Sequence, residues 1–287
     1  DVLGSRGLGD VYKRQLYEES MALLEEAGIK IPGGKRTLLV PARNFPVEVL
    51  FLRDDDIPES VASGVADVGI VGLNEVMEKR CPVGILKKLG FGKCRLSLAI
   101  PQNIDYQDRN WFSGKKIATS YPGILSDYLH KNGIVSDIHV ITGSVEIAPG
   151  IRLADAIFDI VSSGSTLVSN RLKEVETVVE SEAVLIGTDS ISPEKRGILD
   201  ELLFRFDSVQ AADDKKYILM NVPQKKLNDV LSVLPGIKSP TVMPLADKEW
   251  CSVHTVLDEK CFWEIINRLK TAGAEGILVL DIEKMIL

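Results

Sequence analysis

Short apolar runs and helical patterns alternate along the first two thirds of the chain. Residues 37–40, 65–72 and 94–100 are compact apolar runs typical of strands. Residues 16–28 repeat apolar side chains at helical spacing and end at a glycine, which predicts a helix. This alternation favours an α/β fold built on a mostly parallel sheet.

The same patterns predict the remaining elements of this region. Further strands are expected at residues 47–52, 115–119, 138–142 and 183–186. Further helices are expected at residues 56–63, 121–132, 154–162 and 194–209. The helix expected at 154–162 matters most, because it carries two of the candidate functional side chains described below.

The pattern changes after about residue 210. The last segment predicts strands and helices in the order β-α-β-β-α-β, at residues 216–222, 224–234, 239–245, 250–256, 259–273 and 276–280. This order is the ferredoxin-like signature. A chain of 287 residues is long enough for two or three domains. By fold analogy, a ferredoxin-like domain appended to an α/β enzyme is often a ligand sensor.

Charge and cysteine usage narrow the class of protein. The net charge is −7 and the isoelectric point is about 5.2, which argues against a nucleic-acid partner. No apolar run is long enough for a membrane helix, and residues 1–15 lack the pattern of a signal peptide. The four cysteines have no metal-type spacing, which is typical of reduced thiols. We therefore expect a cytoplasmic protein with no membrane partner.

A Ser/Gly/Thr loop is the most informative stretch for chemistry. It consists of Ser162, Ser163, Gly164, Ser165 and Thr166. Consecutive backbone N–H groups, hydroxyls and a glycine suit a phosphate dianion. On the helix expected just upstream, Asp155 and Asp159 share one face, where carboxylates could accept ribose hydroxyls and help order Mg²⁺. The alternative is a polar helix end followed by a Ser/Thr-rich turn.

Five other positions could contact a nucleotide, and each has a structural alternative. Asp55 lies in a run of three aspartates that could hold a cation or simply begin a helix. Gly72 follows a strand, where glycine admits a ligand or permits a tight turn. Lys93 and Arg95 could clamp a polyphosphate or form an exposed basic pair. Tyr121 could stack on a base or begin a helix.

Several segments together identify a family resemblance. Residues 53–58, 91–99, 116–122, 143–149, 153–167 and 276–285 resemble the ATP phosphoribosyltransferase family, in the expected order. The resemblance runs from about residue 16 to residue 287. The last 75 residues make the chain similar to the long, self-regulated form of that family, rather than the short form that needs a separate partner subunit.

The resemblance implies a fold and a reaction. It implies two catalytic lobes like those of type II periplasmic binding proteins, with substrates between them. Lobe I would be residues 1–94 plus 182–209, lobe II residues 95–181, and an ACT-like regulatory domain residues 210–287. N1 of ATP would attack C1 of phosphoribosyl pyrophosphate, and pyrophosphate would leave with Mg²⁺, in the first step of histidine biosynthesis.

The resemblance also implies roles for the candidate residues. The 162–166 loop would hold the 5′-phosphate, and Asp155, Asp159 and Glu146 would face the ribose. It implies feedback inhibition by histidine in the C-terminal domain and a homohexamer or dimer.

The first fifteen residues depart from the family pattern. The family begins with a strand and a basic Gln-Lys-x-Gly-Arg-Leu turn, but Tyr12 stands at the lysine position and Gln15 at the arginine position. We interpret residues 1–15 as a foreign segment, which predicts a first lobe without one strand and without two basic substrate contacts.

Two other functions remain open on the residues alone. One is a cytoplasmic binding module for a small anion or effector on the same two-lobe scaffold. The other is a sugar-phosphate enzyme of a different group transfer, since the adenine acceptor rests on the resemblance. The absence of a Ser/His/Asp or Cys/His pattern argues against a covalent acyl mechanism.

Overall fold

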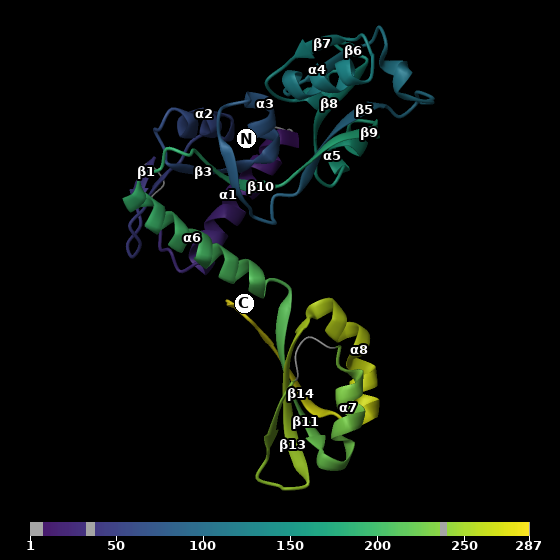
Figure 1. Ribbon diagram of the computed structural model, residues 1–287. Helices are drawn as coiled ribbons and strands as arrows, with labels where there is room; N and C mark the ends of the chain where they lie inside the picture. Colours follow the sequence, from purple (N-terminus) through teal and green to yellow (C-terminus); the bar gives the residue numbers. More distant parts are fainter. Residues whose placement is uncertain (1–7, 33–37, 236–239, 287) are drawn as a thin grey trace, which may run out of the picture. The chain divides into compact units, whose positions relative to one another are not determined.

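The computed structural model describes residues 8–32, 38–235 and 240–286 (Figure 1). The chain divides into two compact units, Asp1–Glu201 and Leu202–Leu287. Residues 1–7, and the residues at the ends of two expected strands, Thr37 and Ser239, lie outside the described part. Within the described part, no helix combines the length and the apolar composition needed to cross a bilayer.

The N-terminal unit opens with helix α1 (Leu8–Glu26) and a two-stranded ribbon of β1 (Leu39–Pro41) and β2 (Glu48–Leu50). Residues 8–15 are the first turns of α1, so they contribute no strand. A three-stranded antiparallel sheet follows, in the order β3 (Val68–Gly72), β10 (Ala183–Gly187), β4 (Gly84–Lys88). Helices α2 (Ile57–Ala62) and α3 (Leu73–Lys79) flank β3 in the chain, and α6 (Pro193–Ala212) follows β10.

A second sheet of five strands completes this unit, in the order β7-β6-β8-β5-β9. Strands β7 (Asp137–Val140), β6 (Lys116–Thr119) and β8 (Ala156–Val161) are parallel to one another. Strands β5 (Cys94–Pro101) and β9 (Leu172–Ser181) are antiparallel to their neighbours. Helices α4 (Pro122–Lys131) and α5 (Ser165–Ser169) follow β6 and β8 in the chain. The α/β class is confirmed, but the prediction of a mostly parallel sheet is wrong.

The helix expected at residues 154–162 is a strand, β8. All six of its residues are buried, because β8 lies between β6 and β5 in the middle of its sheet. A strand buried on both faces reads as an unbroken apolar run, which periodicity cannot distinguish from a buried helix. The fold class survives this error, but the placement of the candidate carboxylates changes.

The chain crosses between the two sheets twice, and the crossings lie side by side. Leu89 N–H donates to Ala183 C=O at 2.9 Å, and Ala183 N–H donates to Phe91 C=O at 2.9 Å. Gly90 and Gly92 have φ values of 80° and 58° in this stretch. The left-handed conformation is available to glycine at little cost.

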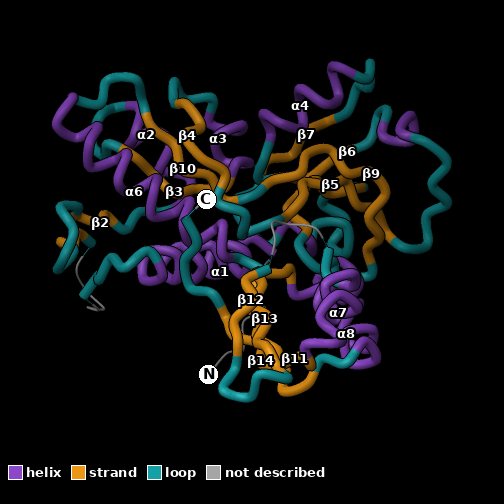
Figure 2. Tube along the Cα trace, turned by 60° about the horizontal axis from the view of Figure 1, so that its bottom comes forward, coloured by secondary structure: helices purple, strands orange, loops and turns teal. Residues whose placement is uncertain are grey.

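The C-terminal unit is a four-stranded antiparallel sheet in the order β12-β13-β11-β14. Its elements are β11 (Lys215–Pro223), α7 (Leu227–Val233), β12 (Thr241–Pro244), β13 (Trp250–Asp258), α8 (Glu259–Ala272) and β14 (Glu275–Asp281). Both helices lie on one face of the sheet (Figures 1 and 2). An apolar core including Ile218, Val253 and Leu269 fills the space between the layers. The predicted β-α-β-β-α-β order is therefore confirmed.

Candidate functional site

Polar side chains gather where the three parallel strands of the five-stranded sheet end. Ser120 and Tyr121 follow β6, and Ser162 follows β8. The segment after β7 leads to a short 3-10 turn, Val145–Ile147, which holds Glu146. Because the carboxyl ends of parallel strands meet at one edge of a sheet, this edge is where open α/β sheets bind their ligands.

The Ser/Gly/Thr loop lies between the end of β8 and the first turn of α5. Gly164 has a φ of +78°, and the Ser163 and Ser165 hydroxyl oxygens are 2.9 Å apart. The first N–H groups of a helix have no partner within it and attract anions. The loop therefore joins a strand to a helix start, rather than following a helix as the sequence suggested. This context still suits a phosphate.

Asp159 and Glu146 are buried at this edge, each about 4% exposed. Asp159 Oδ1 accepts hydrogen bonds from Ile160 N–H at 2.8 Å and from the Ser120 hydroxyl at 3.5 Å. Burial raises the pKa of Asp159 to about 7, and the negative charge of Glu146 adds to the rise. Glu146 Oε2 has no hydrogen-bond donor among the described residues. Leaving such an atom unsatisfied costs about 1–3 kcal/mol, so a donor supplied by a ligand would be favourable here.

Asp155 lies at the opposite end of β8. Its N–H donates to Lys116 C=O at 2.8 Å, and its Oδ2 accepts from Lys116 N–H at 2.9 Å. Seven residues of extended chain place Asp155 roughly 20 Å from the loop. The expectation that Asp155 and Asp159 share a helical face at one site is wrong, because the segment between them is a strand.

The three-stranded sheet contributes a second buried cluster, at the start of α3. The Tyr121 hydroxyl donates to Glu75 Oε1 at 2.9 Å, and Asn74 Nδ2 donates to the Tyr121 oxygen at 3.2 Å. Burial raises the pKa of Glu75 to about 7, and the negative charge of Asp54 adds to the rise. These bonds join the two sheets across the carboxyl-end edge. Neither Asn74 nor Glu75 was predicted; the only sequence signal was their position just after the glycine that ends β3.

Gly72 lies at the closest approach within this cluster. A Cβ atom at Gly72 would lie 2.4 Å from Asn74 Oδ1 and 2.7 Å from the Tyr12 hydroxyl. A larger residue would therefore disturb the buried side chains that join the sheets. The absence of a side chain at Gly72 thus makes room for Asn74 and Tyr12. The sequence alone suggested that it makes room for a ligand or a tight turn.

Helix α1 brings a basic side chain to the same region. Lys13 Nζ lies 2.9 Å from Asp54 Oδ1, and its positive charge opposes the rise of the Glu75 and Asp159 pKa values. Tyr12, at the position of the family lysine, is instead buried at about 2% exposure and its hydroxyl has no hydrogen-bond partner among the described residues. Lys13 was not among the predicted residues, although it directly follows Tyr12.

The other nucleotide-contact candidates differ in their exposure and in their hydrogen-bond partners. Lys93 is exposed. Arg95 is held by Glu174, to which its Nε and Nη2 donate at 2.6 Å each, and its Nη1 donates to Ser162 C=O at 3.2 Å. Arg95 therefore contacts the backbone of the loop at Ser162. The Tyr121 ring is about 5% exposed, so it presents no open face for a base in this structure.

Two aspartates offer oxygen atoms that could face a cation. Asp54 Oδ2 and Asp55 Oδ1 are buried and accept no hydrogen bond from the described residues, although Arg53 Nε lies 3.3 Å from Asp55 Oδ1. No group of three or more His, Cys, Asp or Glu residues in the described part is arranged to hold a metal ion. The donors present fit Mg²⁺ when substrate phosphates supply the rest, because Mg²⁺ commonly takes one or two carboxylates plus phosphate oxygens.

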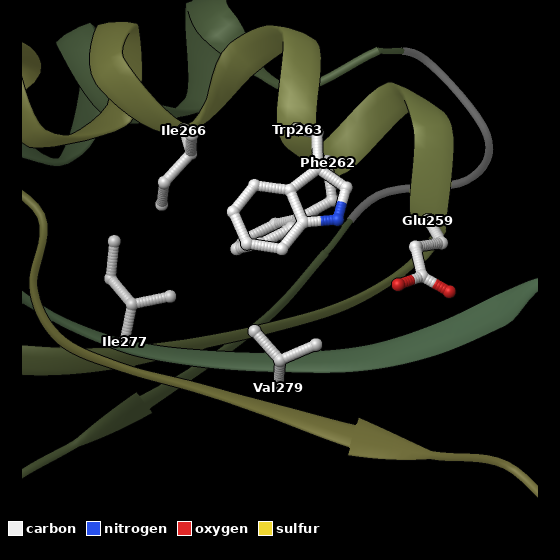
Figure 3. Close-up of a pocket in the computed structure, with 6 residues that line it drawn as sticks. All are labelled: Glu259, Phe262, Trp263, Ile266, Ile277 and Val279. Carbon is white, nitrogen blue, oxygen red and sulfur yellow. The ribbon is translucent and has the colours of Figure 1, made fainter.

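The C-terminal unit has a hollow of about 360 Å³ between α8 and β14 (Figure 3). It is lined by Glu259, Phe262, Trp263, Ile266, Ile277 and Val279. The one charged group, Glu259, already lies 3.2 Å from Lys216 Nζ. An apolar wall with one carboxylate has no partner for the carboxylate of an amino acid, so it gives no support to a histidine site at this place.

Comparison with known proteins gives one consistent result. The family described as ATP phosphoribosyltransferase matches residues 53–208, and that described as HisG, C-terminal domain, matches residues 212–284. An ATP phosphoribosyltransferase of Bacteroides fragilis is 69% identical over 275 residues, covering 96% of this chain and 97% of that protein. One of Parabacteroides distasonis is 65% identical over 274 residues, with the same coverage.

A solved structure matches the chain in part. It is an ATP phosphoribosyl transferase (HisG:HisZ) complex from Thermotoga maritima, with a TM-score of 0.57 and 25% identity. The match covers 67% of this chain and 94% of that one.

Proposed function

Because the chain belongs to the ATP phosphoribosyltransferase family, we propose that phosphoribosyl pyrophosphate and ATP bind where its two N-terminal sheets meet. The family predicted from the sequence is confirmed. The enzyme transfers the phosphoribosyl group to N1 of ATP and releases pyrophosphate, which is the first step of histidine biosynthesis. Membership decides against the alternatives of a binding module and of a different group transfer.

One observation supports the placement of the sugar phosphate. The 162–166 loop, Asp159 and the unsatisfied Glu146 Oε2 lie at the same carboxyl-end edge. In our proposal the loop N–H groups hold the 5′-phosphate, and the two carboxylates accept ribose hydroxyls. Asp155 is left out of this set because it lies at the other end of β8.

The chemistry requires placement more than proton transfer. The N1 lone pair of adenine forms a bond to C1 of the ribose, and the C1–O bond breaks with its electrons leaving on pyrophosphate. The ribose ring carries positive charge on the way, which the carboxylates of Asp159 and Glu146 stabilise when ionised. Holding both substrates in line supplies much of the remaining rate enhancement.

Mg²⁺ that arrives with phosphoribosyl pyrophosphate would neutralise charge on the departing pyrophosphate. Asp54 and Asp55 are the residues we assign to hold it, on the strength of their buried oxygens without hydrogen-bond donors. Lys13, beside Asp54, is the basic group we assign to the substrate phosphates. It would replace the family lysine whose position Tyr12 occupies.

We also propose a role for each part of the chain. Lobe I would comprise residues 1–94 and 182–209, lobe II residues 95–181, and an ACT-like regulatory domain residues 210–287. The pairing of β10 with β3 and β4 supports the return of the chain to lobe I. Histidine would inhibit by binding the C-terminal unit in the less active arrangement. A homohexamer or dimer would be the working state.

The test is pyrophosphate release with ATP, phosphoribosyl pyrophosphate and Mg²⁺, with and without histidine. We expect release that histidine suppresses. Release that histidine does not affect would overturn the regulatory role and leave the transferase intact. If release is absent, calorimetry with phosphoribosyl pyrophosphate separates two causes: binding would point to the atypical residues 1–15, and no binding would refute the loop assignment.

A further inference from the structure

A second contact joins the two N-terminal sheets, outside the cluster around Tyr121. Helix α3 follows the three-stranded sheet and helix α4 belongs to the five-stranded one, and the two helices pack against each other. Figures 1 and 2 both place α3 beside α4. The residues at this contact have no place in the site assigned above.

Glu78 of α3 caps the first turn of α4. Gly123 N–H donates to Glu78 Oε1 at 2.8 Å, and Ile124 N–H donates to Oε2 at 2.9 Å. Both carboxylate oxygens are therefore used on N–H groups that have no partner within their own helix. The helix dipole favours a negative charge at this end, which strengthens the contact.

Gly123 permits this close approach. A Cβ atom at Gly123 would lie 3.0 Å from Glu78 Oε1 and 3.1 Å from Oε2. Any larger residue would press the carboxylate away from the helix end. The contact thus depends on a matched pair, a glutamate on α3 and a glycine on α4.

Arg80 adds a second bond pair at the same junction. Its Nη2 donates to Gly123 C=O at 3.1 Å and to Asp127 Oδ2 at 2.7 Å. Arg80 is exposed and so is Asp127, so this ion pair contributes little by itself. The half-buried carboxylate of Glu78 is the stronger component, since hydrogen bonds to a charged group are roughly twice as strong as neutral ones.

The first turn of α4 leads directly into the proposed site. Ser120 and Tyr121 precede Pro122, the first residue of α4, and they contact Asp159 and Glu75 respectively. Any movement of the α4 start relative to α3 would move both contacts. The two chain crossings at residues 89–91 and 183 lie together, as a hinge between the sheets requires.

We propose that Glu78 is a positioning residue, which holds the two sheets at the spacing the substrates need by gripping the start of α4. The proposal rests on the assignment of the substrates to the junction of the sheets. Glu78 touches no reacting atom, so its effect passes through α4 to Ser120 and Tyr121.

The main test is Glu78→Gln in the full chain, with Glu59→Gln, at an exposed position of α2, as the matched control. A smaller population of correctly spaced protein should raise KM for the substrates about fivefold to fiftyfold, while kcat at saturation stays within about twofold. Amide exchange at Gly123 and Ile124 should become faster only in Glu78→Gln. Unchanged KM with unchanged exchange would overturn the proposal.

A second variant tests the same contact without removing a charge. Gly123→Ala should favour the helix by propensity, yet displace the carboxylate and raise KM as Glu78→Gln does. The double variant should be no worse than the more affected single one, because both changes break one contact. Fully additive effects, or loss of thermal stability with a fall in kcat and no change in KM, would show that Glu78 is only structural. The amide-exchange measurement needs no turnover, so it reports on the contact even if the proposed site fails.

Discussion

The two compact units differ in whether they bury charged side chains. In the N-terminal unit Glu75, Glu146 and Asp159 are buried, and all the described buried side-chain atoms without a hydrogen-bond partner belong to this unit. In the C-terminal unit the described buried side chains are apolar apart from two serines, and Lys215 and Lys216 pair with carboxylates at the ends of the strands. Unsatisfied buried groups cost stability, so their concentration in the N-terminal unit supports the proposal that the substrates bind there.

The largest expected effect is at Asp159, in the second half of β8. Asp159→Asn should lower kcat/KM about 100-fold to 1,000-fold, because it removes a preorganised charge from the reacting centre. The melting temperature should not fall, because the burial penalty of the charged form disappears with the charge. Steady-state kinetics and thermal melting measure the two quantities.

Asp155→Asn is the matched control for this prediction, with the same chemistry at the residue just before the same strand. It should change kcat/KM by less than about threefold, because a side chain roughly 20 Å from the loop cannot contact the ribose. Equal losses in the two variants would contradict the assignment of the site to the carboxyl-end edge.

A smaller effect is expected from the loop. Gly164→Ala would force a residue with φ of +78° into a strained conformation, at about 1–2 kcal/mol. We expect affinity for phosphoribosyl pyrophosphate, measured by calorimetry, to fall about tenfold to a hundredfold as the N–H groups lose their alignment. Gly114→Ala, at φ of +73° in a turn before β6, bears similar strain and should leave affinity unchanged. A similar fall at both glycines would attribute the effect to strain alone.

Glu75 should impose a pH dependence on stability. Its pKa is raised to about 7 in the folded protein, against about 4.3 in the unfolded chain. Its contribution to stability is therefore full below about pH 4 and is lost as pH rises through 7. The decline in melting temperature between pH 5 and 7.5 should be shallower in Glu75→Gln than in the parent. Glu275→Gln, an exposed change on β14, should leave the slope unaltered, and a parallel pair of curves for Glu75→Gln would refute the prediction.

The smallest effect is expected at Tyr12. Removing its unpaired hydroxyl with Tyr12→Phe should raise the free energy of unfolding by about 1 kcal/mol, because a buried group without a partner disappears. Turnover should change little if Lys13 is the basic residue of the site. Denaturant unfolding measures the free energy of unfolding. A large loss of turnover would contradict the prediction and show that the Tyr12 hydroxyl is needed for activity.

Much of the fold follows from local pattern. The C-terminal order of elements was predictable because local pattern marks it: β11 buries alternate residues, and α8 buries one face and ends at Gly273. The 162–166 loop could be proposed as a phosphate site because its residue types suit a phosphate in five consecutive positions. Neither depends on which distant segments come together.

The tertiary structure decided the rest. Residues 156–161 form a fully buried strand because β5 and β6 pair with its two edges in the middle of the sheet, and this extended segment separates Asp155 from Asp159. The tertiary structure also brought Lys13, Glu75 and Glu78 to the junction of the sheets. The local sequence says little about their roles, since the pKa and the partners of a carboxylate depend on which distant side chains exclude water around it.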